Sequence, residues 1–322
     1  MNIGYTKPLY LLPFDHRDSY VSGMFKFKPP LSADQYKRVV ASKQLIYDGF
    51  LAALNNDALR SHAGILIDEE FGAGILHDAI KKGFASAVSV EKSGSDEFEF
   101  EYGNAFATHI AFFKPTFAKV LVRYNPEGDN MLNLRQIARL LRLSNYCRSS
   151  AQRLMFELLV PATPAQMDRF GDNKDAYDRE YRPALMIEAI CTLQDAGIEP
   201  SIWKIEGLDS REDCEKVVDA ARRQGRSEVG CIVLGRGADE KKVAEWLTIA
   251  ATVSGFIGFA VGRTTFWDAV AAFESNAINR EEAVSRIAER YRLWVSTFEK
   301  AHFAQTENSP ELIGATATRL NA

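Results

Sequence analysis

Short apolar segments alternate with longer amphipathic segments along most of the chain. Each apolar segment is six to eight residues long, and those between show apolar positions at helical spacing. The eight predicted strands are Leu9–His16, Gly64–Glu69, Ala85–Lys92, Ala118–Tyr124, Arg153–Val160, Ser201–Glu206, Val229–Leu234 and Phe256–Gly262. Strands that alternate with helices over about 300 residues are typical of a single (β/α)8 TIM barrel, with an open doubly wound sheet as the alternative.

Two of the predicted helices carry recognisable boundary signals. Ser32 stands three residues before Gln35, which predicts a capping box at a helix start. A second helix is expected over residues 241–254, with Gly255 as its stop. Because no Pro-, Gly- or Ser-rich linker divides the chain, we predict one domain over residues 1–322, in which residues 304–322 form a loose tail or an interface arm.

Two predicted loops are long and would stand over the C-terminal end of the barrel. The first covers Asp18–Leu31 and follows the first strand. The second covers Ser95–Gly103, follows the third strand and mixes acidic with aromatic residues. It is equally consistent with a lid over the barrel mouth and with a solvated acidic loop whose aromatics meet a neighbouring subunit.

Composition excludes several classes of protein. The chain has 322 residues, a formal net charge of −4, 46% hydrophobic and 25% charged residues, which argues against a protein built to hold nucleic acid or anionic membrane. Neither a signal peptide nor an uncharged apolar stretch of about 18 residues is present. We therefore expect a cytoplasmic protein that forms a homo-oligomer, acts on a small molecule, and binds neither nucleic acid nor membrane.

Familiar metal and cofactor motifs are also missing. The four cysteines show no CxxC spacing, so reduced thiols are the expectation. The five histidines are scattered and form no HExxH motif. There is no GxGxxG after a first strand and no GxxxxGK[ST]. The sequence therefore predicts neither a metal site nor a cofactor.

Charged residues gather in the predicted strands or at their C-terminal ends, where barrel enzymes place their chemistry. The pairs that concern the site are Asp15 with Arg17 after the first strand, Glu91 with Lys92 at the end of the third, and Lys119 with Arg123 in the fourth. Barrel interiors are normally filled by branched apolar side chains, so inward-facing charges call for a reason.

Strand alternation predicts which of these charges face inward. In the sixth strand, the apolar residues flanking Lys204 would pack under the helices and leave Lys204 with Glu206 inside the barrel. The same argument turns Glu157 inward from the fifth strand and Lys119 with Arg123 from the fourth. Three adjacent strands would thus bring two lysines and a glutamate together in the barrel mouth.

This combination suits covalent catalysis. A lysine that is desolvated beside another cation loses affinity for its proton, and the free amine attacks a carbonyl to give a Schiff base. We therefore predict Lys204 as the nucleophile and Glu157 as the group that moves protons during imine formation. The alternative is a buried ion-pair network without chemistry.

The last two strands lead into a predicted phosphate site. The seventh runs into Gly235-Arg236-Gly237 and the eighth into Gly262-Arg263. Glycine lets backbone N–H groups approach an anion, and an arginine guanidinium matches phosphate oxygens. A Gly-Arg pair is often only a turn, but both pairs stand where these barrels commonly bind phosphate.

Seven segments, in order, resemble a class I aldolase family that includes tagatose-1,6-bisphosphate aldolase and the sulfofructose-phosphate aldolases. They are LPFDHR, IDEEFG, VEKSG, KVLVRYNPEG, FELLVP, WKIEG and VGRTTFWDAV, and they span about Leu9 to Val270. The resemblance is closest to the DUF2090-like aldolase domain fused behind the sugar kinase of some inositol-catabolism proteins, which acts on 2-deoxy-5-keto-gluconate 6-phosphate. The phrases FDHR and GRTTFW are the most specific.

The resemblance implies a (β/α)8 barrel that needs no metal and a role for each matching residue. Lys204 matches the imine lysine, Glu157 the acid and base, Lys119 a lysine near the reacting centre, Asp15 a residue that holds substrate hydroxyls, and Arg263 a phosphate ligand.

The chain departs from the family at two points. No kinase domain is present, so no kinase activity is inferred. Arg123 stands where tagatose-type enzymes tend to have an aromatic residue, and an extra acidic group on the substrate would suit it.

We therefore expect an aldolase that cleaves a phosphorylated keto-sugar or keto-sugar acid to dihydroxyacetone phosphate and a small aldehyde. Lys119 would adjust the pKa values of Lys204 and Glu157 through its charge, and Asp15 would orient the substrate hydroxyls. Arg236 and Arg263 would bind the phosphate group. The expected alternatives are a non-catalytic phosphosugar-binding barrel and an isomerase or epimerase that uses Glu157 and Glu206.

Overall fold

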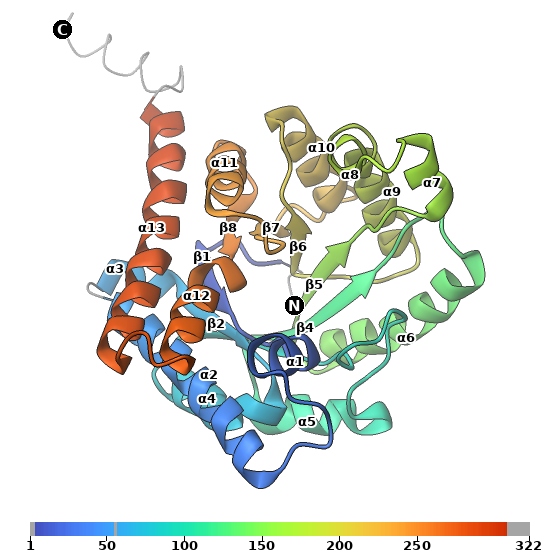
Figure 1. Cartoon of the computed structure of the whole chain (residues 1–322). Helices are drawn as coiled ribbons and strands as arrows, with labels where there is room; N and C mark the ends of the chain where they lie inside the picture. Colours follow the sequence, from blue (N-terminus) through green and yellow to red (C-terminus); the bar gives the residue numbers. More distant parts are fainter. Residues whose placement is uncertain (1–3, 55–56, 308–322) are drawn as a thin grey trace, which may run out of the picture.

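The computed structural model describes residues 4–54 and 57–307, and eight strands in it close into a parallel barrel in the order β1 to β8 (Figure 1). The strands are β1 Leu9–Pro13, β2 Ala63–Ile67, β3 Ala85–Ser89, β4 Phe117–Arg123, β5 Arg153–Leu159, β6 Ile202–Glu206, β7 Gly230–Leu234 and β8 Phe256–Ala260. The β1–β8 pairing closes the sheet, so the predicted TIM barrel is confirmed and the open doubly wound sheet is wrong.

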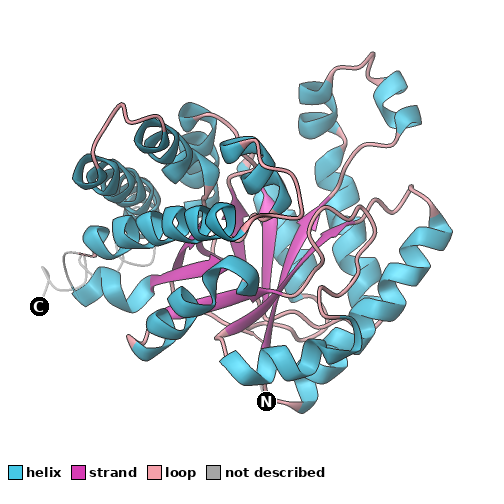
Figure 2. Cartoon of the chain, turned by 60° about the horizontal axis from the view of Figure 1, so that its bottom comes forward, coloured by secondary structure: helices cyan, strands magenta, loops and turns pink. Residues whose placement is uncertain are grey.

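Helices surround the barrel on the outside (Figure 2). They are α1 Asp18–Phe25, α2 Ala33–Ala53, α3 Asp57–His62, α4 Glu69–Lys81, α5 Phe106–Phe113, α6 Asn130–Ser149, α7 Pro164–Arg169, α8 Lys174–Glu180, α9 Arg182–Asp195, α10 Arg211–Arg222, α11 Glu240–Ala251, α12 Arg263–Glu274 and α13 Arg280–Glu307, with a 3₁₀ turn at Gly103–Ala105. The outward side chains of the strands, such as Phe156, Trp203 and Ile205, pack beneath these helices in the main hydrophobic core.

The inside of the barrel has an apolar lower layer and a charged upper layer. The lower layer consists of Leu9, Leu11, Leu66, Ala87, Phe117, Met155, Ile202, Ile232 and Ala260. On β4, β5 and β6 the next inward residues toward the C-terminal end are Lys119, Glu157 and Lys204, all nearly fully buried. The apolar layer closes the bottom of the barrel, so the charged side chains are accessible only from the C-terminal mouth.

The boundary signals in the sequence are largely confirmed. Ser32 caps α2: its Oγ accepts from the Gln35 backbone N–H at 3.2 Å, and the Gln35 side chain accepts from the Ser32 N–H at 2.9 Å. The helix expected over residues 241–254 is α11, which begins one residue earlier and ends at Ala251. Gly255 lies in the turn into β8 with φ +115°, a conformation that glycine adopts without strain.

The expected loops are more ordered than the sequence suggested. The segment Asp18–Leu31 is not all loop, because α1 occupies Asp18–Phe25. After β3, the chain forms a small hairpin in which Glu91 bridges antiparallel to Phe100. Phe98 and Phe100 are buried in the protein's own core, so these two aromatics are not available to a neighbouring subunit.

The predicted tail begins inside a helix. Residues 304–307 complete α13, and the rest of the stretch 304–322 lies outside the described residues. None of the described helices carries an apolar run that would let it span a bilayer.

Candidate active site

One cavity of about 390 Å³ opens at the C-terminal end of the strands. It brings together the twelve residues predicted for the aldolase site: Asp15, Arg17, Glu91, Lys92, Lys119, Arg123, Glu157, Lys204, Gly235, Arg236, Gly262 and Arg263. Glu206, predicted for the isomerase alternative, does not line it. Because seven different strands contribute, only the closed barrel places them together.

The floor of the cavity holds a lysine, a glutamate and a second lysine in contact. Strand register sets Glu157 directly beside Lys204. The Lys204 Nζ lies 2.6 Å from Glu157 Oε1, and the Lys119 Nζ lies 2.8 Å from Glu157 Oε2. The Glu157 carboxylate therefore bridges the two lysines, with one oxygen in contact with each amine. Strand alternation predicted that these three side chains meet.

Three carboxylates converge on Lys119. Its Nζ donates to Asp15 Oδ2 at 2.9 Å and to Glu91 Oε1 at 2.6 Å, in addition to its contact with Glu157. Burial alone would lower the pKa of Lys119, but the charges of Asp15, Glu157 and Glu91 raise it well above the ordinary value. Lys119 is thus a fixed ammonium ion at neutral pH.

Lys204 has the opposite character. Burial is the main cause that lowers the pKa of Lys204; Glu157 opposes this shift, and the nearby charge of Lys119 adds to it. The two buried lysines differ because Lys119 has three carboxylate partners and Lys204 has one. A larger share of uncharged amine at neutral pH makes Lys204 the better nucleophile.

The three carboxylates around Lys119 also differ in pKa, because their surroundings differ. Burial tends to raise the pKa of each, but Lys119 outweighs it for Asp15, and Lys119 with Lys204 outweighs it for Glu157, so both end below their ordinary values. For Glu91 burial prevails and its pKa is raised. Glu157 is therefore a carboxylate at neutral pH and is able to accept a proton.

A loop and a helix start form the β7–β8 side of the cavity. Gly237 has φ +70°, and a Cβ there would stand 2.7 Å from the Arg263 Nη2, so the guanidinium lies flat against this glycine. Gly262 precedes α12 without a side-chain cap, and Thr264 Oγ1 donates to the Ala238 carbonyl at 2.8 Å. Among the described residues, the Arg263 side chain makes no hydrogen bond or ion pair.

Arg236 has a different environment from the one the sequence suggested. It lines the cavity, but its Nε lies 2.7 Å from Glu206 Oε1 and its Nη1 lies 2.6 Å from Asp178 Oδ2. Glu206 also accepts from the Val160 N–H at 3.0 Å. Arg236 thereby ties the β7 loop to β6 and α8.

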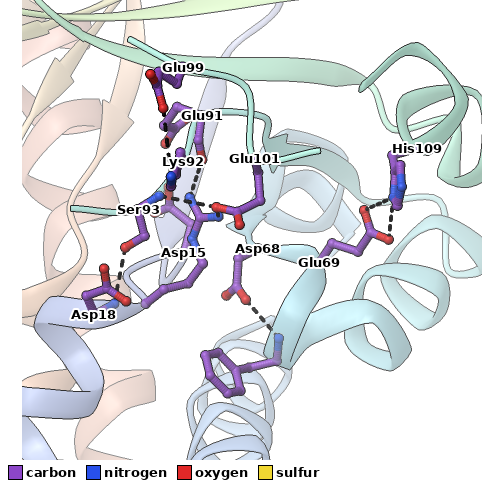
Figure 3. Close-up of polar contacts among 12 residues, drawn as sticks. Asp15, Asp18, Asp68, Glu69, Glu91, Lys92, Ser93, Glu99, Glu101 and His109 are labelled. Atoms are coloured by element: carbon purple, nitrogen blue, oxygen red, sulfur yellow. Dashed lines mark hydrogen bonds and ion pairs between the residues drawn. The ribbon is translucent and has the colours of Figure 1, made fainter. Parts of the chain in front are cut away.

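The hairpin after β3 forms the opposite wall and is tied to the end of β1. The Arg17 Nη1 donates to Glu101 at 2.6 Å. Ser93 donates its N–H to Glu101 and accepts from the Asp18 N–H, both at 3.2 Å (Figure 3). Lys92 lies at the rim, 3.8 Å from Glu99. These contacts fix the hairpin as a wall of the cavity.

Arg123 lies on the same side of the cavity with a partly free guanidinium. It donates to the Ser95 carbonyl at 3.2 Å, and its Nε lies 3.8 Å from Asp96, whose side chain is 95% exposed. An ion pair this exposed contributes little, so a ligand anion is able to replace Asp96.

Sequence reasoning missed His16 and the hairpin tip Ser93–Ser95 as cavity residues. His16 stands inside the motif FDHR and Ser93 with Gly94 inside VEKSG, so the neighbouring candidate residues were the available signal. Ser95 begins the loop that was expected over the barrel mouth.

For the phosphorylated substrate that we propose, replacing Gly237 with alanine is expected to raise the KM about tenfold or more, because the new Cβ displaces the Arg263 guanidinium and alanine is strained at φ +70°. The matched control is Gly83→Ala, which has φ +78° but nothing within 4 Å of its Cβ. Steady-state kinetics of both variants measure the effect. Equal KM values in Gly237→Ala and wild type would contradict this placement of Arg263.

Comparison with solved structures finds the same fold in two aldolases and in a third protein. Fructose-bisphosphate aldolase from Plasmodium falciparum matches with a TM-score of 0.60 at 13% identity, over 92% of each chain. A Schiff-base-forming fructose-1,6-bisphosphate aldolase matches with a TM-score of 0.53 at 12% identity, over 89% of this chain and 94% of its own. Cgl0159 from Corynebacterium glutamicum matches with a TM-score of 0.52 at 15% identity, over 91% and 88%. At these identities the likeness shows the fold.

Comparison with curated proteins finds no match for this chain. A sequence model of one family, described as an uncharacterized protein conserved in bacteria (DUF2090), matches residues 4–302. The protein is therefore a member of the DUF2090 family, with a TIM-barrel fold similar to that of class I fructose-bisphosphate aldolases.

Proposed function

We propose that this protein is a class I aldolase. It cleaves a phosphorylated keto-sugar or keto-sugar acid, such as 2-deoxy-5-keto-gluconate 6-phosphate, to dihydroxyacetone phosphate and a small aldehyde. The observation that carries the proposal is the Lys204 amine, buried on the cavity floor with a lowered pKa, 2.6 Å from a Glu157 oxygen. The fold similarity to a Schiff-base-forming aldolase supports it further.

The reaction begins when the uncharged Lys204 amine attacks the substrate ketone. Glu157, in contact with this amine, moves a proton from the nitrogen of the adduct to its oxygen, which gives the neutral carbinolamine. A second proton, taken up from solvent through Glu157, lets the hydroxyl leave as water and gives an iminium ion. Glu157, again a carboxylate, takes the proton of the substrate hydroxyl while the iminium withdraws electrons from the breaking carbon–carbon bond. An enamine forms and the aldehyde leaves. Protonation of the enamine carbon and hydrolysis of the imine release dihydroxyacetone phosphate.

Lys119 and Asp15 support these steps electrostatically. Lys119 keeps its charge throughout, because three carboxylates hold it, and so helps to keep Lys204 uncharged before attack. Once the iminium carries a positive charge, the surplus of carboxylates around it is stabilising. Asp15 is held by Lys119 at the cavity wall, where its free oxygen would orient substrate hydroxyls.

We assign the phosphate to Arg263, the glycine-rich β7 loop and the start of α12. Arg263 has an exposed guanidinium in the cavity, and backbone N–H groups at the first turn of a helix favour anions. Arg236 already has two carboxylate partners, so its role is to hold the β7 loop in place and to add a positive charge near the bound phosphate.

Replacing Arg123 with glutamine is expected to lower kcat/KM about tenfold or more for condensation of dihydroxyacetone phosphate with malonate semialdehyde, and to leave condensation with propanal unchanged. The reason is loss of a charge-assisted contact with the acidic group. The matched control is Arg148→Gln, which removes an exposed arginine that donates to Asn145 and does not line the cavity. An equal loss of kcat/KM with both aldehydes would show that Arg123 does not bind the acidic group of the aldehyde.

An isomerase or epimerase that uses Glu157 and Glu206 as a pair has less support. Glu206 is occupied by Arg236 and the Val160 N–H and does not line the cavity.

A direct product assay tests the proposal. Incubation with 2-deoxy-5-keto-gluconate 6-phosphate should release dihydroxyacetone phosphate, detected with glycerol-3-phosphate dehydrogenase. An isomeric sugar phosphate with solvent hydrogen and an intact carbon chain would favour the isomerase, and binding without any product would favour the non-catalytic barrel.

A further inference from the structure

His16 lines the cavity but has no role in the steps above. It follows β1, and its backbone carbonyl accepts from the buried Lys43 Nζ at 3.0 Å, while Lys43 forms a buried ion pair with Asp68. The imidazole Nδ1 is buried and has no hydrogen-bond partner. A buried polar atom without a partner is rare and calls for an explanation, because it is destabilising.

The ring lies beside the first turn of α12. Its centroid is 6.4 Å from that of Phe266, at an edge-on angle of 65°. Phe266 is three residues after Arg263 at the start of the same helix. β1 and β8 are neighbours in the barrel, so His16 stands next to the phosphate side of the cavity.

Four charged groups act on the imidazole. Burial is the largest cause and lowers its pKa to about 4; Asp15 and Glu157 oppose this shift, and Arg263 and Lys204 add to it. His16 is therefore uncharged at pH 7 and carries one ring proton. A proton on the enclosed Nδ1 would lack an acceptor, and a buried donor without a partner is worse than a buried acceptor without one. The tautomer with Nε2–H is favoured, and Nε2 is the nitrogen left to face the cavity.

We propose that His16 donates a hydrogen bond from Nε2 to the phosphate group of the bound substrate, as a further partner beside Arg263 and the first turn of α12. The assignment rests on the proposed function for the identity of the substrate, but the anion site is testable without turnover. The unpartnered Nδ1 fixes the proton on Nε2, the nitrogen that donates to the phosphate. An imidazole that stays uncharged makes this contact without placing a third cation close to Lys204.

Calorimetric titration of inorganic phosphate into the whole protein tests this site independently of the chemistry. His16→Ala should weaken binding about tenfold or more, the expected size for a lost hydrogen bond to a charged group. His16→Gln, whose amide nitrogen can reach the position of Nε2, should stay within about threefold of wild type. Equal affinity of His16→Ala and wild type, or equal losses in both variants, would overturn the proposal.

Trapping with borohydride separates this contact from a role at the ketone. His16→Ala should slow adduct formation with dihydroxyacetone phosphate and leave the slower reaction with unphosphorylated dihydroxyacetone unchanged. Equal slowing with both ketones would place His16 at the carbonyl and refute the phosphate contact. Failure of wild type to form an adduct with either ketone would reject the aldolase but leave the phosphate titration decisive for His16.

The pH dependence adds a third readout. Because the donor is uncharged, the ratio of wild-type to His16→Ala phosphate affinity should stay constant between about pH 6.5 and 8. A ratio that grows toward acid would mean that His16 binds as imidazolium, opposite to the form argued here.

Discussion

Replacing Lys204 with methionine is expected to abolish aldol cleavage, with kcat reduced by about 10⁴ or more, because the other buried amine of the cavity, Lys119, is held as an ammonium ion. Methionine has a similar length without the amine. Glu157 keeps its contact with Lys119 at 2.8 Å, so the fold should survive. Cleavage kinetics and a thermal melt of the same preparation measure the two effects.

A useful control for this variant is Glu157→Gln, which keeps the amine but removes the proton acceptor. It should slow turnover by about 10² to 10⁴ and still allow some trapping of the imine. Lys204→Met with wild-type turnover and a normal melt would rule out covalent catalysis through this residue.

Replacing Lys119 with methionine is expected to have the largest effect on stability. It leaves the buried carboxylates of Asp15, Glu91 and Glu157 with one lysine, Lys204, among them. Removal of one partner from a buried ion pair costs about 3 to 5 kcal/mol of unfolding free energy. Denaturant unfolding at pH 7 measures the loss, which should far exceed that of Lys204→Met.

The loss in Lys119→Met should depend on pH in a defined direction. In wild type, the pKa values of Asp15 and Glu157 are lowered in the folded state, so their contribution is present above the ordinary carboxyl pKa and is lost as pH falls through the folded values. Without Lys119, burial is no longer outweighed, and their folded pKa values rise above the unfolded ones. The variant should therefore gain stability as pH falls from 7 toward about 5, and its difference from wild type should shrink.

Asp15→Asn in the Lys119→Met background provides the matched control, since it removes one uncompensated carboxylate. It should recover part of the lost stability at pH 7 and flatten the pH dependence. Lys119→Met with unchanged unfolding free energy at pH 7 would contradict a charged Lys119 at the centre of the cluster.

The inward charges were predictable because strand alternation is a local rule. The apolar neighbours of Lys204 in β6 had to pack under the helices, so its side chain had to face the barrel axis. The same rule placed Lys119 and Glu157, and strand order alone brought the three together. The position of the two glycine-arginine pairs in the cavity wall was predictable, because each pair follows one of the last two strands and the loops after those strands stand at the barrel mouth.

Long-range pairing set the limit of prediction. Arg236 meets Asp178, which is 58 residues away on a short helix, and no local pattern signals that contact. The hairpin after β3 is held by Arg17 and Glu101, which are 84 residues apart. His16 was overlooked because its Nδ1 becomes buried and unpaired only after α12 packs beside β1. Such features depend on tertiary packing.

The central claim is that the Lys204 amine captures a ketone, and borohydride reduction with dihydroxyacetone phosphate tests it most directly. The protein should lose activity and gain a single reduced adduct, and mass mapping of peptides should place that adduct on Lys204. The other lysines of the chain serve as internal controls, including the buried Lys119, which is held as an ammonium ion. An adduct on a different lysine, or no adduct under conditions in which the protein cleaves its substrate, would contradict the account.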